Sequence, residues 1–256
     1  MYKILANTIF LGKDIHFLPV CHSSNDIALR LVREKQAMEG TIVVCADQIR
    51  GKGQRGNAWE TQAGKNLTFS LVLKPDFLDL TEQFYLNMAI SNAIRKIFEE
   101  YVSDIQVKWP NDLVVPGFGK IGGILIENIL GTKGWEYAVV GIGLNINQEV
   151  FSAGQATSLK KLTGSEFDLE EIFRLLIIQI EQNYIRLRQH ALLPIKQEYL
   201  RYLFLWDSWQ SFDTKYGTVN GKISGINPLG KLELTLENGE IQFFDFKEIR
   251  FPSIGI

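Results

Sequence analysis

Apolar residues recur at helical spacing in four stretches of the chain. The clearest stretch is residues 81–100, where apolar positions three and four apart form one continuous side of a helix. A second long helix is predicted to begin with the Asp168-x-x-Glu171 capping pattern and to run to about Arg188. Two shorter helices are expected, one after Ser24-Asn25-Asp26 with Gly40 as its C-cap, and one from Pro194 to near Leu205.

Apolar or alternating runs predict the strands of a sheet. They are residues 41–46, 67–73, 105–109, 121–127 and 137–145. After Trp206, glycines separate short β-rich segments such as Leu232–Leu236, and Glu237-Asn238-Gly239 is typical of a hairpin turn. The pattern predicts an α+β protein, with a mixed β-sheet and flanking helices in residues 1–205 and a small β-barrel in residues 206–256. The polar segment 147–167 is expected to be irregular.

Composition narrows the classes of function. The 256 residues carry a formal net charge of −2, so no overall basic field favours nucleic acid or an anionic membrane. The three histidines and the two cysteines, Cys21 and Cys45, show neither metal-ligand spacing nor a disulfide framework. The N-terminus lacks a signal-peptide pattern, and no apolar run reaches the roughly 18 residues of a membrane span. These features predict a cytoplasmic protein without a metal site built from protein ligands alone.

The glycine-rich segment after the first of these strands admits three interpretations. The sequence Gly51-Lys-Gly-Gln-Arg-Gly56 matches the dinucleotide-binding pattern, with Asp76 at the distance of its ribose-binding acid. However, residues 57–66 are polar and lack the apolar stripe of the crossover helix that this fold requires. A phosphate-binding P-loop is excluded because the residue after Gly56 is not the lysine which that motif needs.

The third interpretation is a mobile cationic loop. Lys52 and Arg55 lie among glycines, which let the backbone approach a ligand closely and resist ordering. Such a loop suits an enzyme that admits an anionic substrate and then keeps water away from a reactive intermediate. Taken alone, the segment is more simply interpreted as a solvated surface turn, so its assignment depends on the rest of the sequence.

Several motifs in one fixed order resemble those of the biotin protein ligase family. They are Ser23-Ser24-Asn25-Asp26, the glycine-rich segment, Lys108-Trp-Pro-Asn-Asp112, Gly119-Lys-Ile-Gly-Gly-Ile-Leu-Ile-Glu127 and Gly141-Ile-Gly-Leu-Asn145. The resemblance is dense over residues 20–150 and looser in the tail. It implies the class II synthetase-like catalytic fold of biotin and lipoate ligases, with an SH3-like C-terminal barrel. Because only 22 residues precede Ser23, a single-function ligase without a DNA-binding repressor domain is expected.

The resemblance implies an ATP-dependent ligase with a two-step reaction. Biotin would be activated by ATP with Mg²⁺ as biotinyl-AMP, and then transferred to a specific lysine of a biotin carboxyl carrier protein. Two anions meet in the first step, so cations must offset their repulsion. The expected partners are biotin, ATP and the carrier protein, with no DNA and no membrane. The chain is expected to be a monomer or a homodimer.

The family's biotin-binding residues correspond to one set of positions in this sequence. Ser24 replaces a family threonine and keeps the hydroxyl group. Lys120 matches a lysine that bridges biotin and phosphate oxygens, and a lysine beside apolar strand residues would be costly without an anionic partner. The residues expected to bind biotin are Ser23, Ser24, Asn25, Gln48, Lys52, Gly53, Gln54 and Lys120. Without the resemblance, the serine-asparagine stretch would be interpreted only as a helix cap.

The resemblance also implies which residues act on ATP. Lys120, Lys52 and Arg55 are expected to be catalytic. The expected nucleotide-binding residues are Arg55, Lys108, Asn111, Asp112 and Asn145. Mg²⁺ is expected to arrive with ATP and to lie near Asp112 and Asn145.

The glycine-rich segment departs from the family pattern at two positions. The family often has arginine where this chain has Lys52 and Gln54. Lys52 keeps the charge but loses the two-pronged hydrogen bonding of a guanidinium group. Gln54 loses the charge at a position that is associated in the family with retaining the adenylate. Arg55, the next residue, could supply the missing cation.

The alternative function is a lipoate or octanoate protein ligase or transferase of the same fold. The arginine-arginine and triple-glycine signatures of those relatives are not visible in this sequence, and the Lys108–Asp112 block favours biotin. A non-catalytic module that only retains biotin is a further alternative. The presence of Lys52, Lys120 and Asn145 argues against it.

Overall fold

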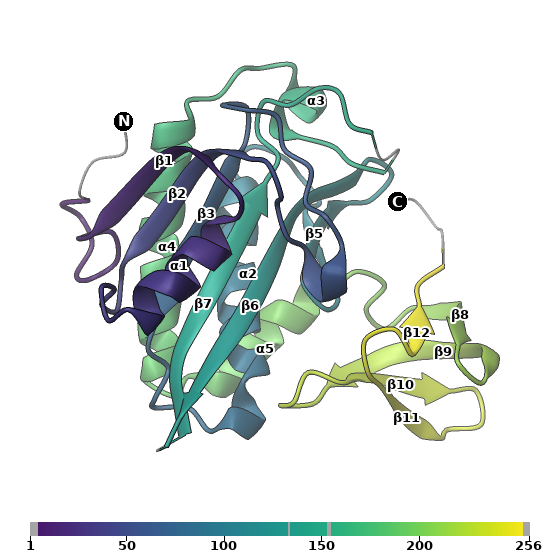
Figure 1. The fold of residues 1–256 in the computed structure, drawn as a ribbon. Coiled ribbons are helices and arrows are strands. Elements are labelled where there is room, and N and C mark those ends of the chain that lie inside the picture. Colours follow the sequence, from purple (N-terminus) through teal and green to yellow (C-terminus); the bar gives the residue numbers. More distant parts are fainter. Residues whose placement is uncertain (1–4, 133, 153–154, 253–256) are drawn as a thin grey trace.

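The larger part of the molecule is a seven-stranded sheet. The computed structural model describes residues 5–132, 134–152 and 155–252, apart from the side chain of Arg55. The strands are β1 (Ile15–Cys21), β2 (Ile42–Gln48), β3 (Leu67–Leu73), β4 (Gln106–Lys108), β5 (Asp112–Val115), β6 (Gly119–Gly131) and β7 (Gly134–Leu144). Their order is β1-β2-β3-β7-β6-β5-β4 (Figure 1). Strands β1 and β2 are parallel and all other neighbours are antiparallel.

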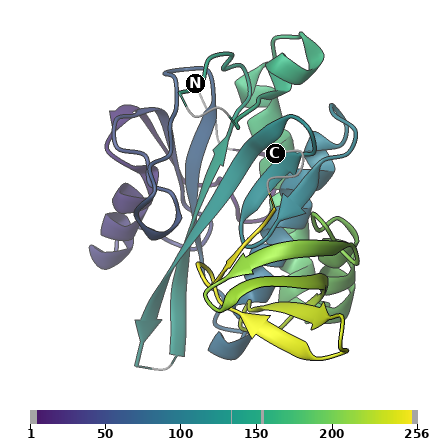
Figure 2. The same cartoon turned by 90° about the vertical axis from the view of Figure 1, so that its right-hand side faces the viewer.

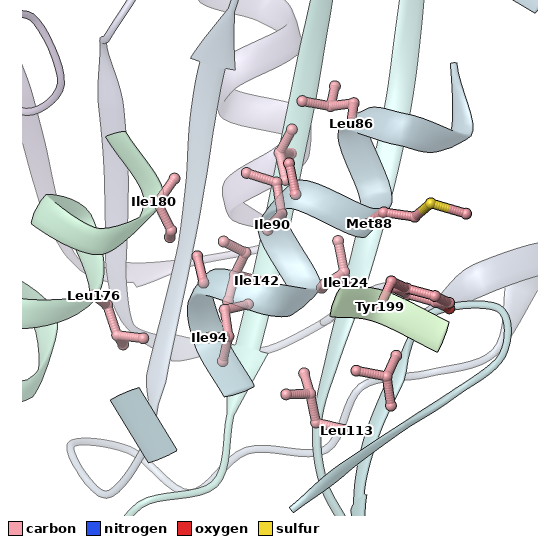
Figure 3. Close-up of a cluster of buried hydrophobic side chains, with 14 of the residues drawn as sticks. Leu86, Met88, Ile90, Ile94, Leu113, Ile124, Ile142, Leu176, Ile180 and Tyr199 are labelled. Atoms are coloured by element: carbon pink, nitrogen blue, oxygen red, sulfur yellow. The ribbon is translucent and has the colours of Figure 1, made fainter. Parts of the chain in front are cut away.

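Helices cover both faces of this sheet. They are α1 (Ser24–Arg33), α2 (Phe84–Phe98), α3 (Leu159–Thr163), α4 (Leu169–Arg188) and α5 (Leu192–Arg201), with 3-10 turns at Gln54–Gly56 and Leu80–Glu82. Figure 3 shows Ile90 and Ile94 of α2 packed close to Ile142 of β7, within the main apolar core. On the opposite face, α1 packs against Val43 and Val139. No helix in the described part of the chain is long and apolar enough to cross a membrane.

A second, smaller sheet follows the helices. Its strands are β8 (Trp209–Thr214), β9 (Gly217–Ile226), β10 (Leu232–Leu236), β11 (Ile241–Phe244) and β12 (Ile249–Arg250), in the order β11-β10-β9-β8-β12. All its pairings are antiparallel. The α+β fold with a mixed sheet and a C-terminal β unit is therefore confirmed. Within the described residues the two outer strands do not pair, so this unit is an open five-stranded sheet rather than a closed barrel. The division at residues 205 and 206 stays a prediction.

The smaller sheet is anchored beside the larger one by an aromatic side chain. The indole Nε1–H of Trp109 donates to the carbonyl oxygen of Gly230 at 2.8 Å, and its ring centroid lies 5.0 Å from that of Phe246. Trp109 follows β4 directly, and Gly230 precedes β10. Figure 2 shows the small sheet, in green and yellow, beside the long β6–β7 pair in teal. This packing places the C-terminal sheet next to strands β4 and β5, which carry the two ends of the Lys108–Asp112 motif.

Most predicted elements are confirmed, and the differences have local causes. Strands β3 and β10 have the predicted bounds, and Asp168 caps α4 by accepting N–H hydrogen bonds from Glu170 (2.8 Å) and Glu171 (3.4 Å). The first helix ends at Arg33, and Lys35 takes a left-handed conformation with φ of 57°. Gly40 is not its C-cap. Instead it has φ of +93° and contacts the backbone of Phe10, where a Cβ atom would lie 2.3 Å from the carbonyl oxygen.

Three elements have no counterpart among the predicted ones. Strands β1 and β5 lacked a clear apolar pattern, because β1 is half-exposed and β5 has only four residues. The segment predicted to be irregular contains the short helix α3, which Ser158 caps through its hydroxyl oxygen. These elements depend on pairing or capping partners that an apolar pattern does not reveal.

A buried carboxylate fixes the N-terminal segment to α4. Glu181 is 4% exposed, and its two carboxylate oxygens accept hydrogen bonds from three consecutive backbone N–H groups, those of Ile9 (2.7 Å), Phe10 (2.8 Å) and Leu11 (2.9 Å). A carboxylate can stay buried when several donors replace its water shell. Glu181 is therefore expected to stabilise the fold without taking part in chemistry.

Replacing Glu181 with glutamine tests this role. An amide has one acceptor oxygen and places an N–H₂ group against N–H donors, so we expect Glu181→Gln to lower the free energy of unfolding by about 2–3 kcal/mol. The measurement is urea denaturation. Glu171→Gln, on the exposed side of the same helix, serves as the control and should change stability by only a few tenths of a kcal/mol. Equal midpoints for parent and Glu181→Gln would contradict the assignment.

Candidate active site

A cavity with about 440 Å³ of empty space, part of it open to solvent, lies on the face of the large sheet that carries α1. It lies between the first turn of α1, the glycine-rich segment and the central strands β6 and β7. All eight residues predicted to bind biotin line it: Ser23, Ser24, Asn25, Gln48, Lys52, Gly53, Gln54 and Lys120. Asn111, predicted to bind the nucleotide, lines it too. Residues that are far apart in the sequence thus meet in one place, although their roles stay predictions.

The serine-asparagine stretch enters the cavity at the start of α1. Ser23 stands at the N-cap position, yet its side chain makes no capping hydrogen bond. The N–H of Ser24 donates to Oε1 of Gln48 at 2.7 Å, which ties the helix start to the end of β2. All three residues of Ser23–Asn25 are at most 4% exposed. The hydroxyl of Ser23 therefore does not cap the helix, and the stretch lines the cavity instead of facing solvent.

Asn25 is held rigidly by two neighbours. Its Oδ1 accepts from the hydroxyl of Ser70 at 2.6 Å, and its Nδ2 donates to Oε2 of Glu127 at 2.8 Å. The hydroxyl oxygens of Ser70 and Ser24 lie 2.8 Å apart, and because the single proton of Ser70 is engaged by Asn25, Ser24 donates in this hydrogen bond. Directly beneath the amide lies Gly141, where a Cβ atom would come within 2.3 Å of Oδ1. Glycine is thus required at this position because Asn25 occupies the space of a side chain.

The two lysines of the cavity are each paired with a carboxylate. Nζ of Lys52 lies 2.5 Å from Oδ1 of Asp26, and Nζ of Lys120 lies 2.6 Å from Oδ1 of Asp112. Hydrogen bonding to Asp26 raises the pKa of Lys52. Both pairs are one-third or more exposed on the lysine side, so water screens them and their energies are small. Such pairs can open when an incoming anion offers a better partner.

The residues predicted to bind the nucleotide lie around the cavity, and Asn111 among them also lines it. Lys108 stands opposite Asp112 in the β4–β5 pairing, and burial lowers the pKa of its ammonium group, an effect to which Lys120 adds. Asn111 donates through Nδ2 to the carbonyl oxygen of Ile124 at 2.6 Å. Asn145 is 3% exposed, and its buried Oδ1 has no hydrogen-bond partner. The side chain of Arg55 lies outside the described residues, so its predicted role stays a prediction.

Trp59 covers the floor of the cavity. The place of a Cβ atom on Gly143 is 2.4 Å from Cε2 of Trp59, and Nζ of Lys120 lies 5.3 Å from the centre of a Trp59 ring. The indole Nε1 is buried without a partner. Glycines in these strands let polar and aromatic side chains lie directly on the sheet backbone.

Sequence reasoning missed three residues that shape the cavity: Ser70, Glu127 and Asp26. Ser70 is the single serine in the apolar run Leu67–Leu73, and a small polar residue in a fully buried strand was a usable signal. Glu127 and Asp26 were inside quoted motifs but had no assigned role. Their partners, Asn25 and Lys52, come from other segments, so the pairings require the fold.

Residues 17–145 match the model of the biotin/lipoate A/B protein ligase family. The chain belongs to this family. A curated relative, the bifunctional ligase/repressor BirA of Bacillus subtilis, is 30% identical over 245 residues, which is 91% of this chain and 72% of the relative. The biotin–[acetyl-CoA-carboxylase] ligase of Paracoccus denitrificans is 30% identical over 188 residues, or 70% of this chain and 76% of the relative. Within this family, the names of these relatives place the chain among the biotin protein ligases, which are enzymes.

Solved structures of the family have the same fold. The biotin protein ligase from Aquifex aeolicus in complex with biotin and ATP aligns with a TM-score of 0.76 and 25% identity, over 93% of this chain and 98% of that one. The Leishmania major ligase in complex with biotinyl-5-AMP aligns with a TM-score of 0.59 and 18% identity over 91% of this chain and 98% of that one, which supports the fold alone. The predicted family resemblance is therefore confirmed.

Proposed function

We propose that the chain activates biotin with ATP to biotinyl-AMP and transfers it to a lysine of a biotin carboxyl carrier protein. The observation that carries the proposal is the cavity in which Lys52 and Lys120 face the buried amide and hydroxyl groups of Ser23–Asn25. A ring system with hydrogen-bonding edges suits the polar wall, and a carboxylate suits the two cations. The Aquifex aeolicus relative, whose structure holds biotin and ATP, supports the same ligands here.

In the first step, an oxygen of the biotin carboxylate attacks the α-phosphorus of ATP. The new phosphorus–oxygen bond forms as the bond to the β-phosphate oxygen breaks, and pyrophosphate leaves. Lys120 would leave Asp112 and Lys52 would leave Asp26 to bind the substrate anions, which offsets repulsion and stabilises the charge that develops. Because each lysine exchanges one anionic partner for another, the cavity does not have to hold an unpaired charge before substrate binds.

Mg²⁺ would enter with the phosphates of ATP. Within the described residues, no three His, Cys, Asp or Glu side chains gather into a metal site, so these residues do not form a complete binding site for the ion by themselves. One carboxylate, Asp112, and the unpartnered Oδ1 of Asn145 are oxygen ligands of the kind that Mg²⁺ takes from proteins when phosphates supply the rest. When bound there, the ion would neutralise phosphate charge.

In the second step, the amine of the carrier lysine attacks the carbonyl carbon of biotinyl-AMP. An amide bond forms, the bond to the phosphate oxygen breaks, and AMP leaves while the amine proton passes to solvent. The carrier is proposed from the names of the relatives, because one of them is named as a ligase for acetyl-CoA carboxylase. The cavity must therefore admit one amine while it limits access of water.

Isotopic exchange between pyrophosphate and ATP separates biotin from lipoate as the substrate. We expect exchange that requires biotin and Mg²⁺, because the adenylate forms reversibly on the enzyme before any carrier is added. Lipoate and octanoate, tested in parallel, should support little exchange. Exchange that depends on lipoate and not on biotin would favour the lipoate ligase alternative, and no exchange with any acid would favour a module that only binds.

A further inference from the structure

A second cavity adjoins the first. It holds about 580 Å³ of empty space, part of it open to solvent, and lies between the start of α2, strand β6 and the C-terminal sheet. Gln54, Asn111 and Ile124 line both cavities, so the two meet at these three residues. The second cavity opens to solvent beside Leu229, which is 51% exposed in the turn before β10. An outside group that entered here would reach the first cavity past Gln54.

The walls of this second cavity are uncharged. Apolar side chains such as Phe84, Ile126 and Leu229 alternate with amides, and no Asp, Glu, Lys, Arg or His of the described residues lines it. A polyphosphate would find no cation there, and an ammonium group would find no carboxylate. Burial without a counter-charge disfavours any charged form. The cavity therefore suits an aliphatic chain that ends in a neutral group able to donate a hydrogen bond.

One residue that lines this cavity carries a buried acceptor without a partner. Asn87 is 6% exposed, and its Nδ2 donates to the carbonyl oxygen of Pro110 at 2.6 Å, which fixes the orientation of the amide. Its Oδ1 is buried and makes no hydrogen bond. An acceptor left in that state costs about 1–3 kcal/mol unless a ligand supplies a donor. Among the other amides of the wall, Asn128 donates to Oε1 of Gln83 at 2.8 Å and Asn111 donates to the carbonyl oxygen of Ile124 at 2.6 Å.

We propose that the second cavity receives the side chain of the acceptor lysine and that Asn87 positions its amine. The four methylene groups would lie along the apolar walls, and an N–H of the neutral amine would donate to Oδ1 of Asn87. The lone pair of nitrogen then attacks the carbonyl carbon of the adenylate in the first cavity, AMP leaves, and the surplus proton passes to solvent. This inference rests on the proposed function, because it needs a bound acyl-adenylate.

Separate measurement of the two half-reactions tests the proposal. Enzyme loaded with biotinyl-AMP is mixed with a carrier domain or with n-butylamine as the smallest mimic of a lysine side chain. For Asn87→Leu we expect transfer to both acceptors to fall about tenfold, the loss of one positioned hydrogen bond. Pyrophosphate exchange with biotin should stay within twofold. Ser91→Ala, one turn further along α2 and also with an unpartnered buried hydroxyl, is the control and should change neither rate.

A second variant changes an exposed residue, so that it does not disturb the packing of the buried core. Leu229→Glu places a carboxylate at the exposed mouth, where it stabilises the ammonium form of an entering lysine and raises the pKa of that amine. The neutral fraction of the acceptor amine at a given pH therefore falls. The rate of transfer should rise at a higher pH than in the parent, whereas pyrophosphate exchange should keep the pH profile of the parent. Unchanged transfer in both variants would overturn the proposal. A raised KM for ATP in Asn87→Leu would also overturn it and assign the cavity to the nucleotide. Absence of adenylate in the parent would instead reject the proposed function.

Discussion

Lys120→Ala is expected to reduce the rate of biotinyl-AMP formation by a factor of about a thousand. The ammonium group of Lys120 lies at the cavity wall beside Asp112, with its side chain 35% exposed. Its removal takes away the cation proposed to stabilise developing charge and leaves the Asp112 carboxylate to repel both anionic substrates. A loss of about 4 kcal/mol in a partly desolvated site corresponds to three powers of ten in rate.

Single-turnover release of pyrophosphate measures this effect directly. Lys65→Ala is the control, since Lys65 forms an exposed ion pair with Glu166 outside the cavity and should be replaceable without effect on the rate. The urea midpoint of Lys120→Ala should match that of the parent, because the lysine pair is partly exposed and adds little stability. Turnover close to that of the parent would remove Lys120 from the mechanism.

Gly141→Ala is expected to weaken biotin binding about a hundredfold. The added methyl group would lie 2.3 Å from Oδ1 of Asn25, and Asn25 cannot retreat because Ser70 and Glu127 hold both ends of its amide. Displacement breaks at least one of these hydrogen bonds and moves a wall of the cavity. A hundredfold change corresponds to about 2.7 kcal/mol, the magnitude of the overpacking and hydrogen-bond losses expected for a buried polar site.

Titration calorimetry with biotin gives the affinity, and urea denaturation gives the stability. The control is Gly117→Ala, where φ is +80° and no atom lies within 4 Å of the added Cβ atom. That variant should lose about 1–2 kcal/mol of stability from backbone strain yet bind biotin normally. If Gly141→Ala bound biotin as the parent does, the arrangement of Asn25 over the sheet would not form the binding site.

The sequence could predict the central elements of the fold because their patterns are strong. Helices α2 and α4 and strand β3 carry continuous apolar positions, and Asp168 is a recognisable cap. The C-terminal strands were anticipated from spaced glycines. Whether five short strands close into a barrel depends on pairing between the two edge strands, here β11 and β12, which no local pattern specifies. Helix α1 ends at Arg33, before Gly40, and the role of Gly40 is a close contact with Phe10 from another segment.

The candidate site was predictable only as far as its motifs were. Ser23, Asn25 and Lys120 belong to recognisable stretches, and the fold brings them together. The carboxylates that neutralise the lysines could not be assigned, because Asp26 lies in α1, 26 positions before Lys52, and Asp112 lies on the strand next to that of Lys120. Ser70 and Asn87 act through partners distant in the sequence, Asn25 and Pro110. Such pairings follow from the packing of helices against the sheet and not from residue type.

Transfer of biotin to a carrier domain is the most direct test of the central claim. The purified protein is incubated with biotin, ATP, Mg²⁺ and a biotin carboxyl carrier domain, and the carrier is analysed by mass spectrometry with mapping of the modified residue. We expect a carrier that gains one biotinyl group on a single lysine, only when ATP is present, with release of AMP and pyrophosphate. A carrier that stays unmodified while the same domain is biotinylated by a ligase of known activity would contradict it.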